Sequence, residues 1–209
     1  MIRKKNLSGV SLAASCHILL AATPMLEANN IRELIALAKN SPLPYAIPGT
    51  GTSMHLAAEL LESLAGVDMA HVPYKGGSAA CPGVIVGRVP LLFASIGHIK
   101  AGRMKVIAIT SSEPGTSNPE IGTIAEAVPG FDEKSGSGGV VPETTPREIV
   151  CKSSADIGRV LAMADVKNRI AEVGMKPAAT APEAVDSFMR REIERWAPVI
   201  KASGAKAAD

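Results

Sequence analysis

A segment of small residues, Pro48–Ser53, has the composition of an anion-binding loop. It follows a candidate strand at Tyr45–Ile47 and precedes an amphipathic helix. Small side chains leave the backbone N–H groups of such a loop accessible, and the helix start adds roughly half a positive charge. The hydroxyls of Thr50, Thr52 and Ser53 add hydrogen-bond donors. The segment predicts a site for a carboxylate, phosphate or sulfate. The alternative is an ordinary strand-to-helix turn with hydroxyl caps.

Two further features could act with this loop. His55 lies in the first turn of the helix, either as a partly buried histidine or as a group that orients the loop. The turn that begins at Tyr74 and Lys75 could supply a phenol, a cation and the amides of Gly76 and Gly77 to a bound anion. An exposed turn without a ligand is the alternative for this second feature.

Other chemistries lack their motifs. The loop is neither a Walker A sequence, which requires a lysine, nor GxGxxG, and the chain contains no GxSxG or HExxH. His55 and His71 have no matched ligands at metal-binding spacing. Cys16, Cys81 and Cys151 form no CxxC and carry no nucleophile signature. The residues therefore predict no metal, no cofactor and no catalytic group.

Composition excludes several classes of protein. Among 209 residues, 46% are hydrophobic and 20% are charged, which is typical of a globular chain and not of a disordered one. The net charge is +2 with dispersed basic residues, and only six side chains are aromatic, so no nucleic-acid partner is expected. No apolar run reaches the ~18 residues of a membrane span.

Helix and strand signals alternate along the chain, which predicts an α/β fold with a mostly parallel sheet. Asn30 should cap the first helix, and Gly66 should end the second. Pro82 and Gly83 should shorten or break a helix at 78–86. The other expected elements are strands at 69–72, 89–94 and 106–110, a weak strand or hinge at 135–141, and helices at 146–162, 165–173 and 182–203. Thr145-x-x-Glu148 and Thr180-x-x-Glu183 have the pattern of capping boxes.

The N-terminus allows two interpretations. Basic residues at Met1–Lys5 precede the apolar, small-residue-rich stretch Leu7–Leu26, as in a secretory signal peptide. A buried strand is the alternative, because His17 lies within the stretch and no good A-x-A cleavage site follows it. The residues alone leave both interpretations open.

Several stretches together resemble the Bug family of periplasmic solute-binding proteins, the receptors of tripartite tricarboxylate transporters. They occur in the family's order from about Leu7 to Lys206. The stretches are Ile31–Lys39, Tyr45–His55 (YAIPGTGTSMH), His71–Gly76 (HVPYKG), His98–Gly102 (HIKAG), Pro129–Phe131, Thr145–Val150 (TPREIV), Asp165–Lys167 and Trp196–Lys201.

The resemblance implies a periplasmic-binding-protein-like "Venus flytrap" α/β fold that binds a small di- or tricarboxylate without catalysis or cofactor. Membrane permease subunits of the transporter are the implied protein partners. Residues 1–110 would form the second, ligand-loop domain with its crossover strand, and 111–209 the remaining, helix-rich part of the first domain, which would partly return to the second. The implied ligand-binding residues are Gly49, Thr50, Gly51, Thr52, Ser53, His55, Tyr74 and Lys75.

The chain also departs from the family pattern. Family members are longer than this chain. They carry an N-terminal signal peptide and a Pro-Gly-Gly ligand loop, and this sequence has no match to either feature. Leu7–Ser15 resembles the family's interdomain strand instead, which favours a strand over an export signal and leaves the first domain incomplete. We therefore expect a periplasmic location by family, or a cytoplasmic one for a true short form. The alternative function is a truncated relic that binds no solute, or an interaction protein that needs a partner chain.

Overall fold

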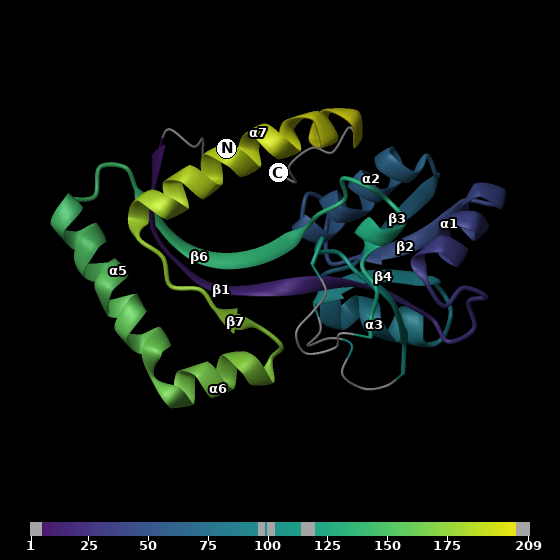
Figure 1. The fold of residues 1–209 in the computed structure, drawn as a ribbon, viewed down its shortest axis with the longest axis horizontal. Helices are drawn as coiled ribbons and strands as arrows, with labels where there is room; N and C mark the ends of the chain where they lie inside the picture. Colours follow the sequence, from purple (N-terminus) through teal and green to yellow (C-terminus); the bar gives the residue numbers. More distant parts are fainter. Residues whose placement is uncertain (1–5, 96–98, 100–102, 114–119, 204–209) are drawn as a thin grey trace. The chain divides into compact units, whose positions relative to one another are not determined.

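The computed structural model describes residues 6–95, 99, 103–113 and 120–203 (Figure 1). The chain divides into two compact units. Unit 1 comprises Met1–Cys16 and Ser135–Ala197, and unit 2 comprises His17–Lys134 and Pro198–Asp209. The described residues 120–134, which follow the ligand-loop segment, lie in unit 2.

Unit 2 is built on a mixed β-sheet with the strand order β3-β2-β4-β1-β5. The strands are β1 (Leu7–Ala22, whose last six residues belong to this unit), β2 (Leu43–Ile47), β3 (Met69–Pro73), β4 (Leu91–Ser95) and β5 (Lys105–Ile109). β2 runs parallel to both β3 and β4, whereas β1 pairs antiparallel with β4 and β5. The expectation of a mostly parallel sheet therefore holds for three strands, and β1 makes the sheet mixed.

Both faces of this sheet are buried. Alternate residues of β1 divide between two hydrophobic clusters: Ile18 and Leu20 join the first, while Leu19 and Ala21 join the second. The alternation follows from the two-residue period of a strand. Helices α1 (Ile31–Asn40) and α2 (Ser53–Ala65) contribute to the first cluster, and α3 (Gly77–Ile85) contributes to the second. Residues 7–22 form a strand in the structure, as the second interpretation of the N-terminus predicts.

Helix α3 contains Pro82 within its nine residues, so the helix is short but is not broken at the proline. Gly83 has a packing reason to be glycine, because a Cβ atom there would lie 2.7 Å from the hydroxyl oxygen of Tyr74. The phenol of Tyr74 therefore packs against α3 at Gly83, where the helix has no side chain.

The segment after β5 returns to the core of unit 2. A short 3-10 helix, η2 (Ile124–Glu126), begins with a capping box between Thr123 and Glu126. Ile124, Val128 and Phe131 are almost completely buried and join the first hydrophobic cluster. These buried side chains join the segment after β5 to unit 2.

Unit 1 contains the first part of β1, β6 (Lys134–Pro142), β7 (Lys176–Pro177), α5 (Arg147–Ala162), α6 (Ala164–Glu172) and α7 (Pro182–Ser203) up to Ala197. Both β6 and β7 pair with β1, so the glycine-rich stretch 135–141 is a strand. Burial in this unit is sparse, and α6 has no buried residue at all. Exposed large apolar side chains of the unit include Ile149, Val160, Met163, Val173 and Ile193.

The two predicted capping boxes are not what begins the helices of unit 1. The first of them is wrong, because α5 has Pro146 as its N-cap and no side-chain cap hydrogen bond. The hydroxyl of Thr180 accepts a hydrogen bond from the N–H of Leu12 (3.1 Å), and its own N–H donates to Ser11 Oγ (3.1 Å). Thr180 therefore fixes the chain before α7 to β1. Among the described helices, none combines the length and the apolarity needed to cross a membrane.

Candidate functional site

The two segments singled out from the sequence lie next to each other. Because β2 and β3 are parallel, the loops that follow them leave the same edge of the sheet. The N–H of Tyr74 donates to the carbonyl of Ile47 (2.9 Å), and the N–H of Gly76 donates to the carbonyl of Pro48 (3.0 Å). The structure thus places the turn with Tyr74 and Lys75 beside the loop Pro48–Ser53. Of the stretch His98–Gly102, quoted above for the family resemblance, all but Ile99 lies outside the described residues.

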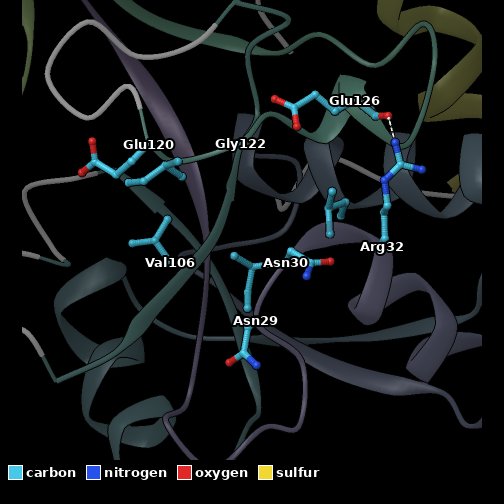
Figure 2. Close-up of a pocket in the computed structure, with 10 residues that line it drawn as sticks. Asn29, Asn30, Arg32, Val106, Glu120, Gly122 and Glu126 are labelled. Carbon is cyan, nitrogen blue, oxygen red and sulfur yellow. Dashed lines mark hydrogen bonds between the residues drawn. The ribbon is translucent and has the colours of Figure 1, made fainter.

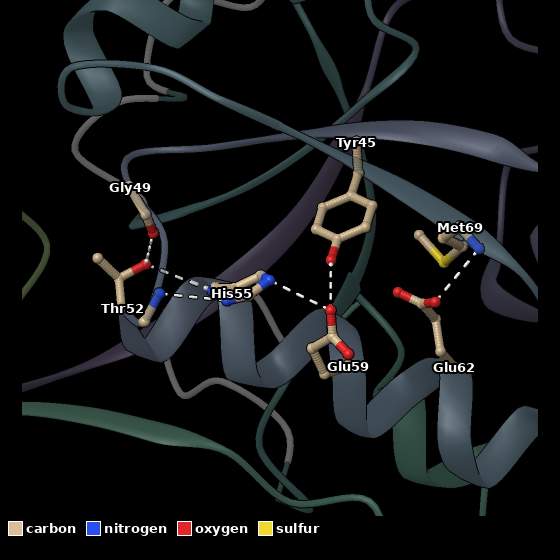
Figure 3. Close-up of polar contacts among 8 residues, drawn as sticks. Tyr45, Gly49, Thr52, His55, Glu59, Glu62 and Met69 are labelled. Carbon is tan, nitrogen blue, oxygen red and sulfur yellow. Dashed lines mark hydrogen bonds and ion pairs between the residues drawn. The ribbon is translucent and has the colours of Figure 1, made fainter. Parts of the chain in front are cut away.

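The loop is held in shape by Thr52, the N-cap of α2 (Figure 3). Its hydroxyl donates to the carbonyl of Gly49 (2.8 Å) and accepts from the N–H of His55 (3.4 Å). Gly51 has a φ of 78°, in the left-handed region that favours glycine. The hydroxyl proton of Thr52 is therefore used within the loop. Thr52 would contribute to ligand binding indirectly, by positioning the amides around it.

The side chain of His55 stabilises the same loop through a hydrogen bond. The N–H of Gly51 donates to Nδ1 of His55 (3.2 Å), while Nε2 faces Oε1 of Glu59 at 3.1 Å. The side chain is only 1% exposed, and its ring packs edge-on against that of His71 with centroids 4.7 Å apart. Burial, with a smaller contribution from His71, lowers the pKa of His55, although Glu59 opposes this. Since Nδ1 accepts a hydrogen bond, the neutral ring carries its proton on Nε2.

The exposed side of the loop has the character of an anion site. Thr50 and Gly51 are exposed, as is Lys75 in the neighbouring turn. The first amides of a helix have no acceptor within the helix, and the N-terminus of α2 follows directly on this loop. Amides, a helix N-terminus and a nearby ammonium group together favour a carboxylate or another oxyanion. The assignment of the eight predicted ligand-binding residues remains a prediction.

Sequence reasoning missed the polar side chains that continue from His55 along α2. Glu59 lies four residues after His55 and within 3.4 Å of the buried hydroxyl of Tyr45. One turn further, Glu62 accepts a hydrogen bond from the N–H of Met69 (3.3 Å). Burial, with added repulsion from the glutamates, raises the pKa of Tyr45. The i, i+4 spacing of His55 and Glu59 was the available signal, because such residues share one face of a helix.

Glu62 makes the stability of unit 2 depend on pH. Burial, then repulsion from Glu59, raises the pKa of this carboxyl to about 7, so the folded protein holds a proton that the unfolded chain loses near pH 4.5. Stability should therefore fall as the pH rises from 4.5 to 7. The variant Glu62→Gln, which is always neutral, should be more stable than the parent at pH 8 by about 1 kcal/mol, after allowance for partial exposure. Thermal melts at pH 5 and pH 8 test this, and an equal difference between variant and parent at both pH values would contradict it.

A separate pocket of about 360 Å³ lies at the start of α1 in unit 2 (Figure 2). It is lined by Asn29, Asn30, Ile31, Arg32, Val106, Ile107, Glu120, Ile121, Gly122 and Glu126. The guanidinium of Arg32 donates to the carbonyl of Glu126 (2.8 Å) across the pocket wall. With two glutamates against one arginine, this pocket is a poorer anion site than the loop after β2.

The sequence matches one protein family over nearly its whole length. Residues 2–205 match the family described as "Tripartite tricarboxylate transporter family receptor". A UPF0065 protein of Pseudomonas sp. (strain P51) is 35% identical over 91% of this chain. Protein BugT of Bordetella pertussis is 29% identical over 97% of it. The chain spans 59% and 64% of the lengths of these two relatives.

Solved structures show the same fold. An R. palustris protein solved with adipate has a TM-score of 0.86 and 29% identity, over 96% of this chain and 69% of its own. MatC from Rhodopseudomonas palustris with bound malate has a TM-score of 0.83 and 27% identity, over 95% of this chain and 71% of its own. These similarities confirm the predicted α/β fold class of periplasmic binding proteins. The chain belongs to the tripartite tricarboxylate transporter receptor family, among the solute-binding receptors related to the Bug proteins.

Proposed function

We propose that this chain is a periplasmic receptor that binds a small di- or tricarboxylate and delivers it to the membrane permease subunits of a tripartite tricarboxylate transporter. The observation that carries the proposal is the pair of neighbouring loops at the carboxyl edge of β2 and β3, joined by the hydrogen bond from Gly76 to Pro48. One loop ends in a helix N-terminus and the other carries Lys75, so both favour a carboxylate.

The proteins of similar structure support the chemical class of the ligand. Two relatives above 25% identity were solved with adipate and with malate, both of which are dicarboxylates. In the present chain, the loop Gly49–Ser53 and the N-terminus of α2 would hold one carboxylate group, with Tyr74 and Lys75 beside it. His55 would act indirectly by fixing Gly51. We assign no catalytic step, cofactor or nucleic acid to this site.

A thermal melt in the presence of candidate acids tests the proposal. A ligand that binds only the folded protein adds RT ln(1 + [L]/Kd) to the free energy of unfolding, about 2.7 kcal/mol at a hundred times Kd. Adipate, malate, succinate and citrate should be compared at millimolar concentration. The matched control for adipate is 1,6-hexanediol, which keeps the carbon chain but removes both charges. We expect the melting temperature to rise with at least one acid and not with the diol. A melting temperature that is unchanged by every acid would contradict the proposal.

The surface of unit 1 favours a second candidate, an interaction protein that needs a partner chain. α6 has no buried residue, and Met163 and Val173 at its two ends are more than half exposed. Uncovered apolar surface of this kind is typical of an interface. Sedimentation velocity over a range of concentrations would distinguish the candidates. A concentration-dependent dimer without any acid-induced stabilisation would favour the interaction protein.

A further inference from the structure

We propose that His55, Glu59 and His71 bind a divalent metal ion of the zinc class, in unit 2 below the loop after β2. Each of the three residues offers one ligand atom, and these atoms all lie within 4.8 Å of one another. Two imidazoles and a carboxylate form a donor set that zinc prefers, with a fourth position left for water. Carboxylate binding at the loop after β2 does not require a metal ion at this site.

The fold brings the three ligands together from two elements. His55 and Glu59 lie one turn apart on the same face of α2, and His71 comes from β3, the edge strand of the sheet. The burial of the three side chains is graded. His55 is buried, Glu59 is half-buried and His71 is exposed, so an ion can enter from the side of His71. The helix thus supplies the more buried part of the site, and the strand supplies the accessible part.

The buried nitrogen of His55 is the observation that points to a ligand. Nε2 has no exposed surface and makes no aligned hydrogen bond, although Glu59 Oε1 lies 3.1 Å away. The two atoms face each other, as two ligands of one ion would. Two ligand atoms about 2.0–2.2 Å from a tetrahedral zinc ion stand roughly 3.3–3.6 Å apart. A small outward shift of Glu59 would therefore make room for an ion between His55 Nε2 and Glu59 Oε1.

Neighbouring groups already orient the carboxylate. The hydroxyl of Tyr45 lies 3.4 Å from Oε1 of Glu59, and the Tyr45 side chain is completely buried. A partner of this kind limits the rotation of a metal ligand and raises affinity for the ion. The ring of Tyr45 also stands 6.4 Å from that of His71, centroid to centroid, so one aromatic residue flanks two of the three ligands.

Metal binding would change the loop above the site. In the present arrangement, the N–H of Gly51 donates to Nδ1 of His55. A neutral histidine that binds metal through Nε2 carries its proton on Nδ1. Two donors would then face each other, and the N–H of Gly51 would have to turn away. The amide of Gly51 is therefore a local reporter of an ion on His55.

The test is a titration of the full chain with Co²⁺ and Zn²⁺ in the absence of any carboxylic acid, at neutral pH. Co²⁺ should produce visible absorption typical of a four- or five-coordinate site, and Zn²⁺ should displace it. His71→Asn and Glu59→Gln should each weaken affinity by roughly tenfold or more. Glu62→Gln is the matched control, because it makes the same chemical change one turn away on α2, and it should change affinity by less than about threefold. Circular dichroism should show that all three variants are folded.

The amide resonance of Gly51 in a two-dimensional NMR spectrum provides the second measurement. Zn²⁺ should shift it in the parent and not in His71→Asn at the same concentration. The proposal is overturned if millimolar Co²⁺ gives no absorption, if Glu59→Gln and His71→Asn bind as the parent does, or if Gly51 does not respond. Because no acid is present, each of these failures leaves the carboxylate proposal intact, and a failure of the acid melts leaves the metal proposal intact.

Discussion

Thr52→Asp should abolish carboxylate binding while the protein stays folded. Asp is as good an N-cap as Thr, and a negative charge at a helix N-terminus is favourable, so stability should change by no more than about 1 kcal/mol. The same charge would lie where the ligand's carboxylate is expected. Two like charges 4 Å apart near a protein surface repel by about 4 kcal/mol, so affinity should fall at least about a hundredfold. Calorimetric titration with the acid that stabilises the parent most measures the loss.

Thr52→Asn is the matched control for this substitution. Asn has the shape of Asp and caps the helix equally well, but it is neutral and can still donate to the carbonyl of Gly49, as Thr52 does. We expect it to keep its affinity within about tenfold of the parent, since one neutral hydrogen bond is at stake. Equal affinities of the Asp and Asn variants would show that no ligand charge lies at this helix start.

Leu61→Ala should lower the free energy of unfolding by about 2–5 kcal/mol, because it leaves a cavity in the first hydrophobic cluster. Leu61 is 1% exposed and packs among the residues of that cluster. Urea unfolding followed by circular dichroism measures the change. The only tryptophan, Trp196, belongs to unit 1. Its fluorescence therefore follows the unfolding of unit 1 for comparison.

Leu64→Ala provides the control on the same helix. Leu64 lies three residues further along α2 and is 44% exposed, so the same substitution removes little buried area. Its effect should stay within about 0.5 kcal/mol. Similar losses for the two variants would mean that α2 does not pack on the sheet through the face that carries Leu61.

Local signals predicted the elements that end in caps or stops. Asn30 accepts a hydrogen bond from the N–H of Glu33 (3.0 Å) as an N-cap should, and Gly66 ends α2 with a φ of 62°. Both features depend on neighbours within one turn, which a sequence pattern contains. Proline at residue 146 misled the prediction, because it became the N-cap of α5 itself and left Thr145 outside the helix.

Pairing between distant strands could not be predicted in this way. The antiparallel direction of β1 against β4 and β5, and the return of Phe131 to the first cluster, depend on contacts between segments far apart in the sequence. The site shows the same limit. The loop Pro48–Ser53 was recognisable from its small residues, but the approach of His71 to His55 and Glu59 depends on contacts between α2 and β3.

The position of β1 in the sheet has a consequence for synthesis of the protein. β1 precedes β4 and β5 in the chain and lies between them in the sheet, yet Leu20 meets its partner Phe93 only after about seventy further residues have been made. At about 5–20 residues per second, the ribosome needs several seconds to supply them. During that time the apolar side chains of residues 18–22 have no partner strand to cover them. A chaperone that holds extended apolar segments should therefore raise the yield of folded protein most when it acts on the nascent chain before β4 emerges.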